Sequence, residues 1–148
     1  MKLLSSAFVN GDTIPKKYGY KFENINPPLK IENIPENTKS LVLIMDDPDA
    51  LAAVGKIWVH WMIANISPNV TIIRENTIPI DSIQGENDFN ETGYGGPAPP
   101  DKEHTYNFII YALNTKLQIK NNFSKSEILK LMQNHVISQA TLKGIFYP

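Results

Sequence analysis

Apolar residues along this chain gather in short runs that are separated by prolines. Ser40–Met45 carries a continuous apolar run of strand length, and Ile57–Ile66 is longer and rich in β-branched and aromatic residues. Thr105–Leu113 alternates between the two faces of a strand, and Thr71–Ile80 is a weaker example. Prolines recur through the first half, so no helix can run far there. The pattern predicts a mainly β domain.

One helix is predicted near the C-terminus. The segment from Ser124 to Glu127 has the form of a capping box, in which the serine accepts from first-turn N–H groups and the glutamate reaches back. Apolar residues follow at helical spacing, namely Ile128, Leu129, Leu131, Met132, Val136 and Ile137. The spacing predicts a helix that ends near Ala140, with His135 packed on or beside its apolar stripe, and then a strand around Leu142–Tyr147.

Length and composition narrow the class of protein. The 148 residues have the length of one domain, and no linker or repeat divides them, so residues 1–148 are predicted to form a single domain. The absence of cysteine excludes a disulfide scaffold, a thiolate zinc site and a cysteine nucleophile. With 14 basic and 15 acidic residues, the chain lacks the excess of positive charge that is typical of nucleic-acid-binding proteins. Without a signal-peptide core or an apolar membrane span, we expect a soluble, cytoplasmic protein.

The most unusual segment is Gly93–Pro100, which contains three glycines and three prolines. Glycine lets a backbone approach other groups closely, and proline restricts φ. Successive free N–H groups in such a turn can bind an anion, although a rigid connection between strands is the simpler interpretation. The segment leads into His104 and Tyr106, which share one face of the predicted strand.

Two further polar groups interrupt apolar strands. Alternation places His60 on the same face as Trp58 and Met62, opposite Trp61. A buried imidazole needs a partner, so His60 is either a core residue bonded to the backbone or part of a site. The carboxylates of Asp46–Asp49 follow another strand, where they could bind a metal, orient a histidine or stabilise a turn.

These segments together resemble the phosphatidylethanolamine-binding proteins, in their short bacterial and archaeal branch known as Raf kinase inhibitor-like proteins. Asp47–Ala50 is similar to the first family signature, and Gly93–Pro100 with His104–Tyr106 is similar to the second. Trp58–Trp61 matches the segment between them, and the similarity covers nearly the whole chain. The resemblance implies an antiparallel Greek-key β-sandwich with a C-terminal helix. It also implies a small pocket for phosphate, acetate or a phosphorylethanolamine head group. The positions that match the family's pocket residues are Asp47, Asp49, His60, Ala98, Pro99, His104 and Tyr106, with Tyr94 nearby.

The sequence departs from the family pattern at the rim of this pocket. Leu51 stands where the family often has a proline in a cis bond. A cis bond before a residue other than proline costs about 3 kcal/mol, so the turn is either trans or strained. Thr105 replaces the usual arginine, and Lys102-Glu103 replaces a glycine-containing step.

The candidate residues favour the binding of an anion. His60, His104, the Tyr106 hydroxyl and the backbone near Ala98 can all donate hydrogen bonds. A nearby Asp47 would raise a histidine pKa, so anion affinity is predicted to fall as pH rises. The only arginine, Arg74, lies far from the motifs in sequence, so we expect no bidentate arginine clamp and a modest affinity. We therefore expect a regulatory binding protein for a small anion or phosphorylated head group, with no cofactor, no metal and no membrane insertion.

Two other classes of function stay open. An aspartate and two histidines could act as acid and base or hold a metal, but no nucleophile lies among the motifs and the histidine spacing matches no standard metal site. The resemblance also suggests an inhibitor of a serine protease or a kinase that acts outside the pocket. Exposed strand edges would allow a homodimer.

Overall fold

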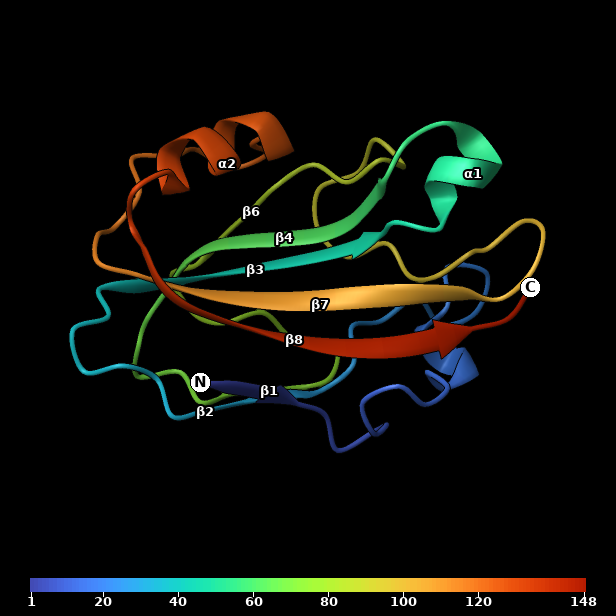
Figure 1. Ribbon diagram of the computed structural model, residues 1–148, viewed down its shortest axis with the longest axis horizontal. Helices are drawn as coiled ribbons and strands as arrows, with labels where there is room; N and C mark the ends of the chain where they lie inside the picture. The colour runs from blue at the N-terminus through green and yellow to red at the C-terminus, as the bar shows by residue number, and fades with distance from the viewer.

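The computed structural model describes all 148 residues, and its strands form two antiparallel sheets (Figure 1). The larger sheet has the order β6 (Ile83–Gln84), β4 (Trp58–Ile66), β3 (Ser40–Asp47), β7 (His104–Leu113) and β8 (Val136–Phe146). The smaller sheet has the order β1 (Lys2–Leu4), β2 (Leu29–Glu32) and β5 (Ile72–Ile73). After β4 the chain crosses to β5 and returns to place β7 on the other side of β3. The predicted antiparallel β-sandwich is confirmed.

Two hydrophobic cores lie on opposite faces of the larger sheet. The sandwich core of 19 buried residues joins the sheets, for example through Ile31 of β2 and Phe108 of β7. The second core of 10 residues is covered by α2 (Lys125–Met132), which contributes Ile128 and Met132. Figure 1 shows α2 over one face and the smaller sheet over the other. Since each buried side chain of this size stabilises the fold by about 1.5–3 kcal/mol, both faces hold the sheet in place. No helix is long and apolar enough to cross a membrane.

The main strands follow the predicted apolar runs. β3 continues beyond its run to Asp47, and β7 alternates as expected, with His104, Tyr106 and Phe108 all buried. Within Thr71–Ile80 only the two residues of β5 pair. The short strands β1, β2 and β6, the helix α1 (Ala50–Val54) and the 3-10 turn η1 (Lys16–Tyr18) add to the predicted elements.

The C-terminal helix begins where the sequence predicts but ends earlier. Ser124 Oγ accepts a hydrogen bond from the backbone N–H of Glu127 at 3.2 Å. The helix ends at Met132 rather than near Ala140, and β8 then pairs with β7 along nearly its whole length. The prediction was wrong because the apolar residues after Met132 also suit a strand, and pairing with distant β7 decides between the two. His135 therefore lies off the helix, where its Nδ1 bonds to the Asn114 side chain at 2.8 Å.

A bulge interrupts β4 at His60. Met45 of β3 faces Trp61, and Asp46 faces Val59, so His60 is an extra residue in the pairing. A bulge turns side chains away from simple alternation. As a result Trp61 enters the sandwich core, whereas Val59 and Met62 both enter the core beneath α2. The His60 ring packs against Tyr106 of the sandwich core, so its predicted grouping with Met62, opposite Trp61, was wrong.

Candidate functional site

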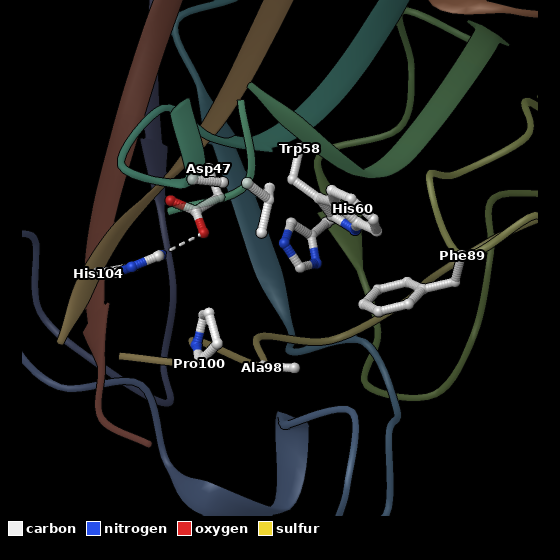
Figure 2. A pocket seen from close by; sticks show the side chains of 9 residues that line it. Asp47, Trp58, His60, Phe89, Ala98, Pro100 and His104 are labelled. Carbon is white, nitrogen blue, oxygen red and sulfur yellow. Dashed lines mark hydrogen bonds and ion pairs between the residues drawn. The ribbon is translucent and has the colours of Figure 1, made fainter. Parts of the chain in front are cut away.

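A cavity of about 180 Å³ lies where β3 ends and where β4 and β7 begin (Figure 2). α1 and the Gly93–Pro100 segment complete its walls. The lining residues combine charged and apolar side chains, and they are Asp47, Ala50, Val54, Trp58, His60, Phe89, Ala98, Pro100 and His104. A concave site of this mixed character, built at strand ends, is the usual place for a small ligand.

The Gly93–Pro100 segment forms a fixed wall of the cavity. Gly95 donates its N–H to the His60 carbonyl at 2.8 Å, and Gly96 donates to Asn24 Oδ1 at 2.7 Å. A Cβ atom on Gly96 would lie only 2.0 Å from the Tyr18 carbonyl oxygen, so this position requires glycine. Because both N–H groups are bonded within the protein, they do not form the anion-binding turn considered from the sequence. The simpler interpretation of a rigid connection is the one that the structure supports.

His104, the first residue of β7, lies between two carboxylates. Its Nδ1 is 2.6 Å from Asp47 Oδ2, and its Nε2 is 2.7 Å from Asp101 Oδ1. Burial alone would lower the pKa of the ring, but the hydrogen bonds to both carboxylates outweigh burial and raise it above its ordinary value. His104 is therefore a site of positive charge. Both of its N–H groups are already bonded, so it does not offer the free donor that the sequence suggested.

His60 occupies the opposite wall in different surroundings. Its Nδ1 lies 2.6 Å from the Gly95 carbonyl oxygen. A carbonyl only accepts, so Nδ1 carries the proton and Nε2 of the neutral ring is an acceptor. Burial lowers the pKa of His60, and the bond to Gly95 only partly opposes this. Of the two histidines, His104 alone is favoured as the cation.

Three buried polar atoms around the cavity have no hydrogen-bond partner. They are Asp47 Oδ1, Trp58 Nε1 and the Tyr106 hydroxyl, and the only other such side-chain atom in the protein is Thr38 Oγ1. An unsatisfied buried polar group costs about 1–3 kcal/mol, so three in one place call for an explanation. Burial raises the pKa of Tyr106 well above its ordinary value, and the charge of Asp47 adds to this, so the phenol stays a donor. The chain has no group of three or more carboxylate and histidine side chains arranged to hold a metal ion.

The structure brings most of the predicted site residues together. Asp47, His60, Ala98 and His104 line the cavity. Tyr106 lies directly behind them, with its ring edge-on to the His60 ring at a centroid distance of 5.1 Å. These residues converge because β3, β4 and β7 are neighbours that start or end at the same edge of the sheet.

Besides Tyr106, three predicted residues lie outside the cavity wall. Asp49 accepts a hydrogen bond from the Thr105 N–H at 2.8 Å, on the outer side of the site. The Tyr94 hydroxyl donates to the Tyr18 carbonyl at 2.8 Å, and its ring packs in the sandwich. Pro99 is buried, whereas its neighbour Pro100 lines the cavity.

Sequence reasoning missed several residues of the site. Trp58 was considered only as a strand neighbour of His60, although that spacing could have marked it as a wall residue. Asp101 stands three positions before His104, and a carboxylate at that distance was a usable signal. Phe89 had no local signal, since its position depends on stacking against Tyr20 at a centroid distance of 3.9 Å.

The turn after Asp47 takes the trans alternative, because the chain has no cis peptide bond. The Leu51 N–H donates to the Pro48 carbonyl at 3.2 Å and helps to start α1. Ala50 and Val54 of this helix face the cavity, while the Leu51 side chain is exposed. The rim on this side is thus a short apolar helix.

A two-sheet sandwich with a small polar cavity at the ends of its strands defines the class of this molecule. The model of the family described as "Phosphatidylethanolamine-binding protein" matches residues 4–147, and the chain belongs to this family. The expected resemblance is confirmed.

Known relatives extend over the whole chain. A protein of Methanothermobacter thermautotrophicus, named UPF0098 protein, is 42% identical over 99% of this chain and 98% of its own length. One from Chlamydia trachomatis with the same name is 40% identical, with coverage of 99% and 98%. None of these names is that of an enzyme.

Solved structures agree with the fold. A homologue of phosphatidylethanolamine-binding proteins from Chlamydia trachomatis has a TM-score of 0.91 at 39% identity and covers 97% of this chain and 95% of its own. Escherichia coli YbcL, described as a member of the mammalian family, has a TM-score of 0.90 at 29% identity, with coverage of 98% and 96%.

Proposed function

We propose that this protein binds a small anion, such as a phosphate or phosphorylethanolamine-like head group, and regulates or inhibits a partner protein through that binding. The observation that carries the proposal is the set of unpartnered buried atoms at the cavity. Trp58 Nε1 and the Tyr106 hydroxyl are donors that suit phosphate oxygens, and Asp47 Oδ1 is an acceptor. Membership in a family described by phosphatidylethanolamine binding supports the same class of ligand.

The charges of the site favour a ligand of low net charge. A protonated His104 between ionised Asp47 and Asp101 leaves one net negative charge, and His60 is neutral. A dianion would therefore be repelled more than a monoanion or a zwitterion. An ammonium group could donate to Asp47 Oδ1 while phosphate oxygens accept from the opposite donors, which suits a phosphorylethanolamine-like group.

Calorimetric titration with O-phosphoethanolamine, phosphate, sulfate and ethanolamine tests the proposal. Tyr106→Phe removes one donor and should weaken phosphoethanolamine binding about tenfold, because a hydrogen bond of this kind contributes about 1.4 kcal/mol. Tyr111→Phe is the matched control, since this phenol lies on the same strand but packs beneath α2. If none of the ligands binds, or if Tyr106→Phe binds as tightly as the parent, the proposal is wrong.

The pH dependence gives a second test. His104 has a raised pKa, so its positive charge is present at low pH and is lost as pH rises through that value. Sulfate keeps a fixed charge, and its affinity should fall between about pH 5.5 and 8.5, a range chosen around the ordinary histidine value. His104→Gln should bind sulfate weakly and without this dependence. A flat profile for the parent would mean that neutral donors alone hold the anion.

The partner and the assembly stay predictions. We propose action in the cytoplasm and leave open a homodimer formed through a free strand edge. β8 is the outermost strand of the larger sheet, and residues 10–14 already bond to its outer edge at Lys143 and Ile145, so only the earlier part of the strand presents an open edge. Such an open edge can pair with a second copy, and sedimentation analysis would detect the dimer.

A further inference from the structure

The two carboxylates on His104 differ in how firmly they are held. Asp47 is the last residue of β3, its side chain is 4% exposed, and it bonds to Nδ1. Asp101 lies in the connection before β7, its side chain is 46% exposed, and it bonds to Nε2. One carboxylate is thus part of the buried framework, whereas the other is open to solvent at the rim. Asp101 directly follows Pro100 in the chain and bonds to His104, and both of these residues line the cavity.

The Asp101 carboxylate occupies the place beside His104 Nε2 where an anionic ligand would accept a hydrogen bond. Protonated His104 has two N–H donors, and Asp47 holds the first inside the protein. The Nε2–H is therefore the only donor of His104 that can exchange one acceptor for another without opening the core. A third negative group beside His104 would be repelled by both carboxylates while Asp101 stays in place.

We propose that Asp101 is an internal competitor for the ligand, and that an anion takes the Nε2 hydrogen bond of His104 by displacing this carboxylate. The inference rests on the proposed function and adds a determinant of specificity to it. A neutral molecule could not replace Asp101 without leaving the buried cation with one counter-charge fewer. The place that the Asp101 carboxylate leaves therefore selects ligands that carry a negatively charged acceptor.

The surroundings of Asp101 fit displacement. Asp101, Lys102 and Glu103 are all exposed, so the side chain can move into water without disturbing either core. Exposed ion pairs are held weakly because water and salt compete with them. The hydrogen bond from His104 lowers the pKa of Asp101, so the competitor carries its full charge at neutral pH.

The experiment compares phosphoethanolamine and sulfate binding by calorimetry in the parent, Asp101→Asn, Asp101→Ala and Glu103→Gln. Removing the competing charge should tighten binding of both ligands about tenfold, a change typical of one close charged contact. Glu103→Gln is the matched control, because it removes the same charge from the same exposed segment without touching His104. Its affinity should change less than about twofold, since exposed charges at a distance are screened. Melting temperatures verify that each variant is folded.

The possible results separate this inference from the proposed function. Tighter binding in both Asp101 variants with an unchanged Glu103→Gln supports displacement. Binding by the parent that the Asp101 variants do not improve overturns displacement and leaves the proposed function standing. An equal gain in Glu103→Gln also overturns it, because the effect would then be general electrostatics. If no variant binds either ligand, the proposed function fails and this inference fails with it.

Discussion

The two walls of the cavity carry the same residue, histidine, in opposite surroundings. On the β4 wall, His60 is enclosed by aromatic rings and bonds to the Gly95 carbonyl, and burial lowers its pKa. On the β7 wall, burial opposes charge on His104 as well, but Asp47 and Asp101 outweigh it and raise its pKa. Burial lowers the pKa of both rings, so the two carboxylates bonded to His104 explain why the positive charge lies on that wall.

The two walls also arise in different ways. His60 reaches the cavity because a bulge adds it to β4, and a backbone carbonyl then sets its orientation. His104 reaches the cavity by regular alternation at the start of β7 and is oriented by side chains. The β4 wall is thus a neutral surface shaped by the backbone, and the β7 wall is an electrostatic one.

The largest effect is expected from breaking the charged wall. Asp47→Ala leaves His104 buried with only an exposed partner, and the free energy of unfolding should fall by about 3–5 kcal/mol, as when one member of a buried ion pair is removed. Urea denaturation measures this loss. Asp49→Ala serves as control, because it removes only one hydrogen bond to the Thr105 N–H and should cost about 1 kcal/mol. Equal losses in the two variants would contradict the framework role of Asp47.

The neutral wall can be broken through the backbone that holds His60. In Gly96→Ala the new Cβ would overlap the Tyr18 carbonyl and move the adjoining Gly95, so stability should fall by about 2 kcal/mol. Gly55→Ala is the control, since its Cβ meets no atom and the cost of about 1 kcal/mol comes only from its left-handed φ. A Gly96 variant as stable as the Gly55 variant would show that the segment is not rigid.

A smaller effect is expected at the turn between the walls. Leu51→Pro removes the N–H that donates to the Pro48 carbonyl and should lower stability by about 1 kcal/mol. Leu51→Ala keeps that N–H and trims a side chain that is 57% exposed, so it should be close to neutral. Thermal unfolding measures both. A higher melting temperature for Leu51→Pro would argue against the trans turn.

NMR titration of the two histidines tests the difference between the walls without altering the fold. His104 should titrate above about 6.5 and His60 below it. The stabilisation from His104 is then complete below about pH 6.5 and is lost as pH rises through its folded pKa. The stabilisation from keeping His60 neutral is present above about pH 6.5 and is lost as pH falls through its folded pKa. Assignment by His60→Gln and His104→Gln identifies the signals, and titration of both on the same side of 6.5 would refute the contrast.

Features of this protein that depend on neighbouring residues could be predicted from the amino-acid sequence. Apolar runs and alternation predicted β3, β4 and β7, and the Ser124 cap predicted where α2 begins, because period and capping are local properties of the chain. Shared strand faces and the family signatures also indicated that Asp47, His60 and His104 belong to one site.

Features that depend on distant residues could be seen only in the folded structure. Pairing with β7 turned the predicted end of the helix into β8, and a mismatch against β3 placed His60 in a bulge. The opposite charge states of His60 and His104 likewise depend on Gly95, Asp47 and Asp101, which the fold brings within hydrogen-bond distance. Hydrogen-bond pairing and burial join residues far apart in the chain, so local patterns alone do not contain them.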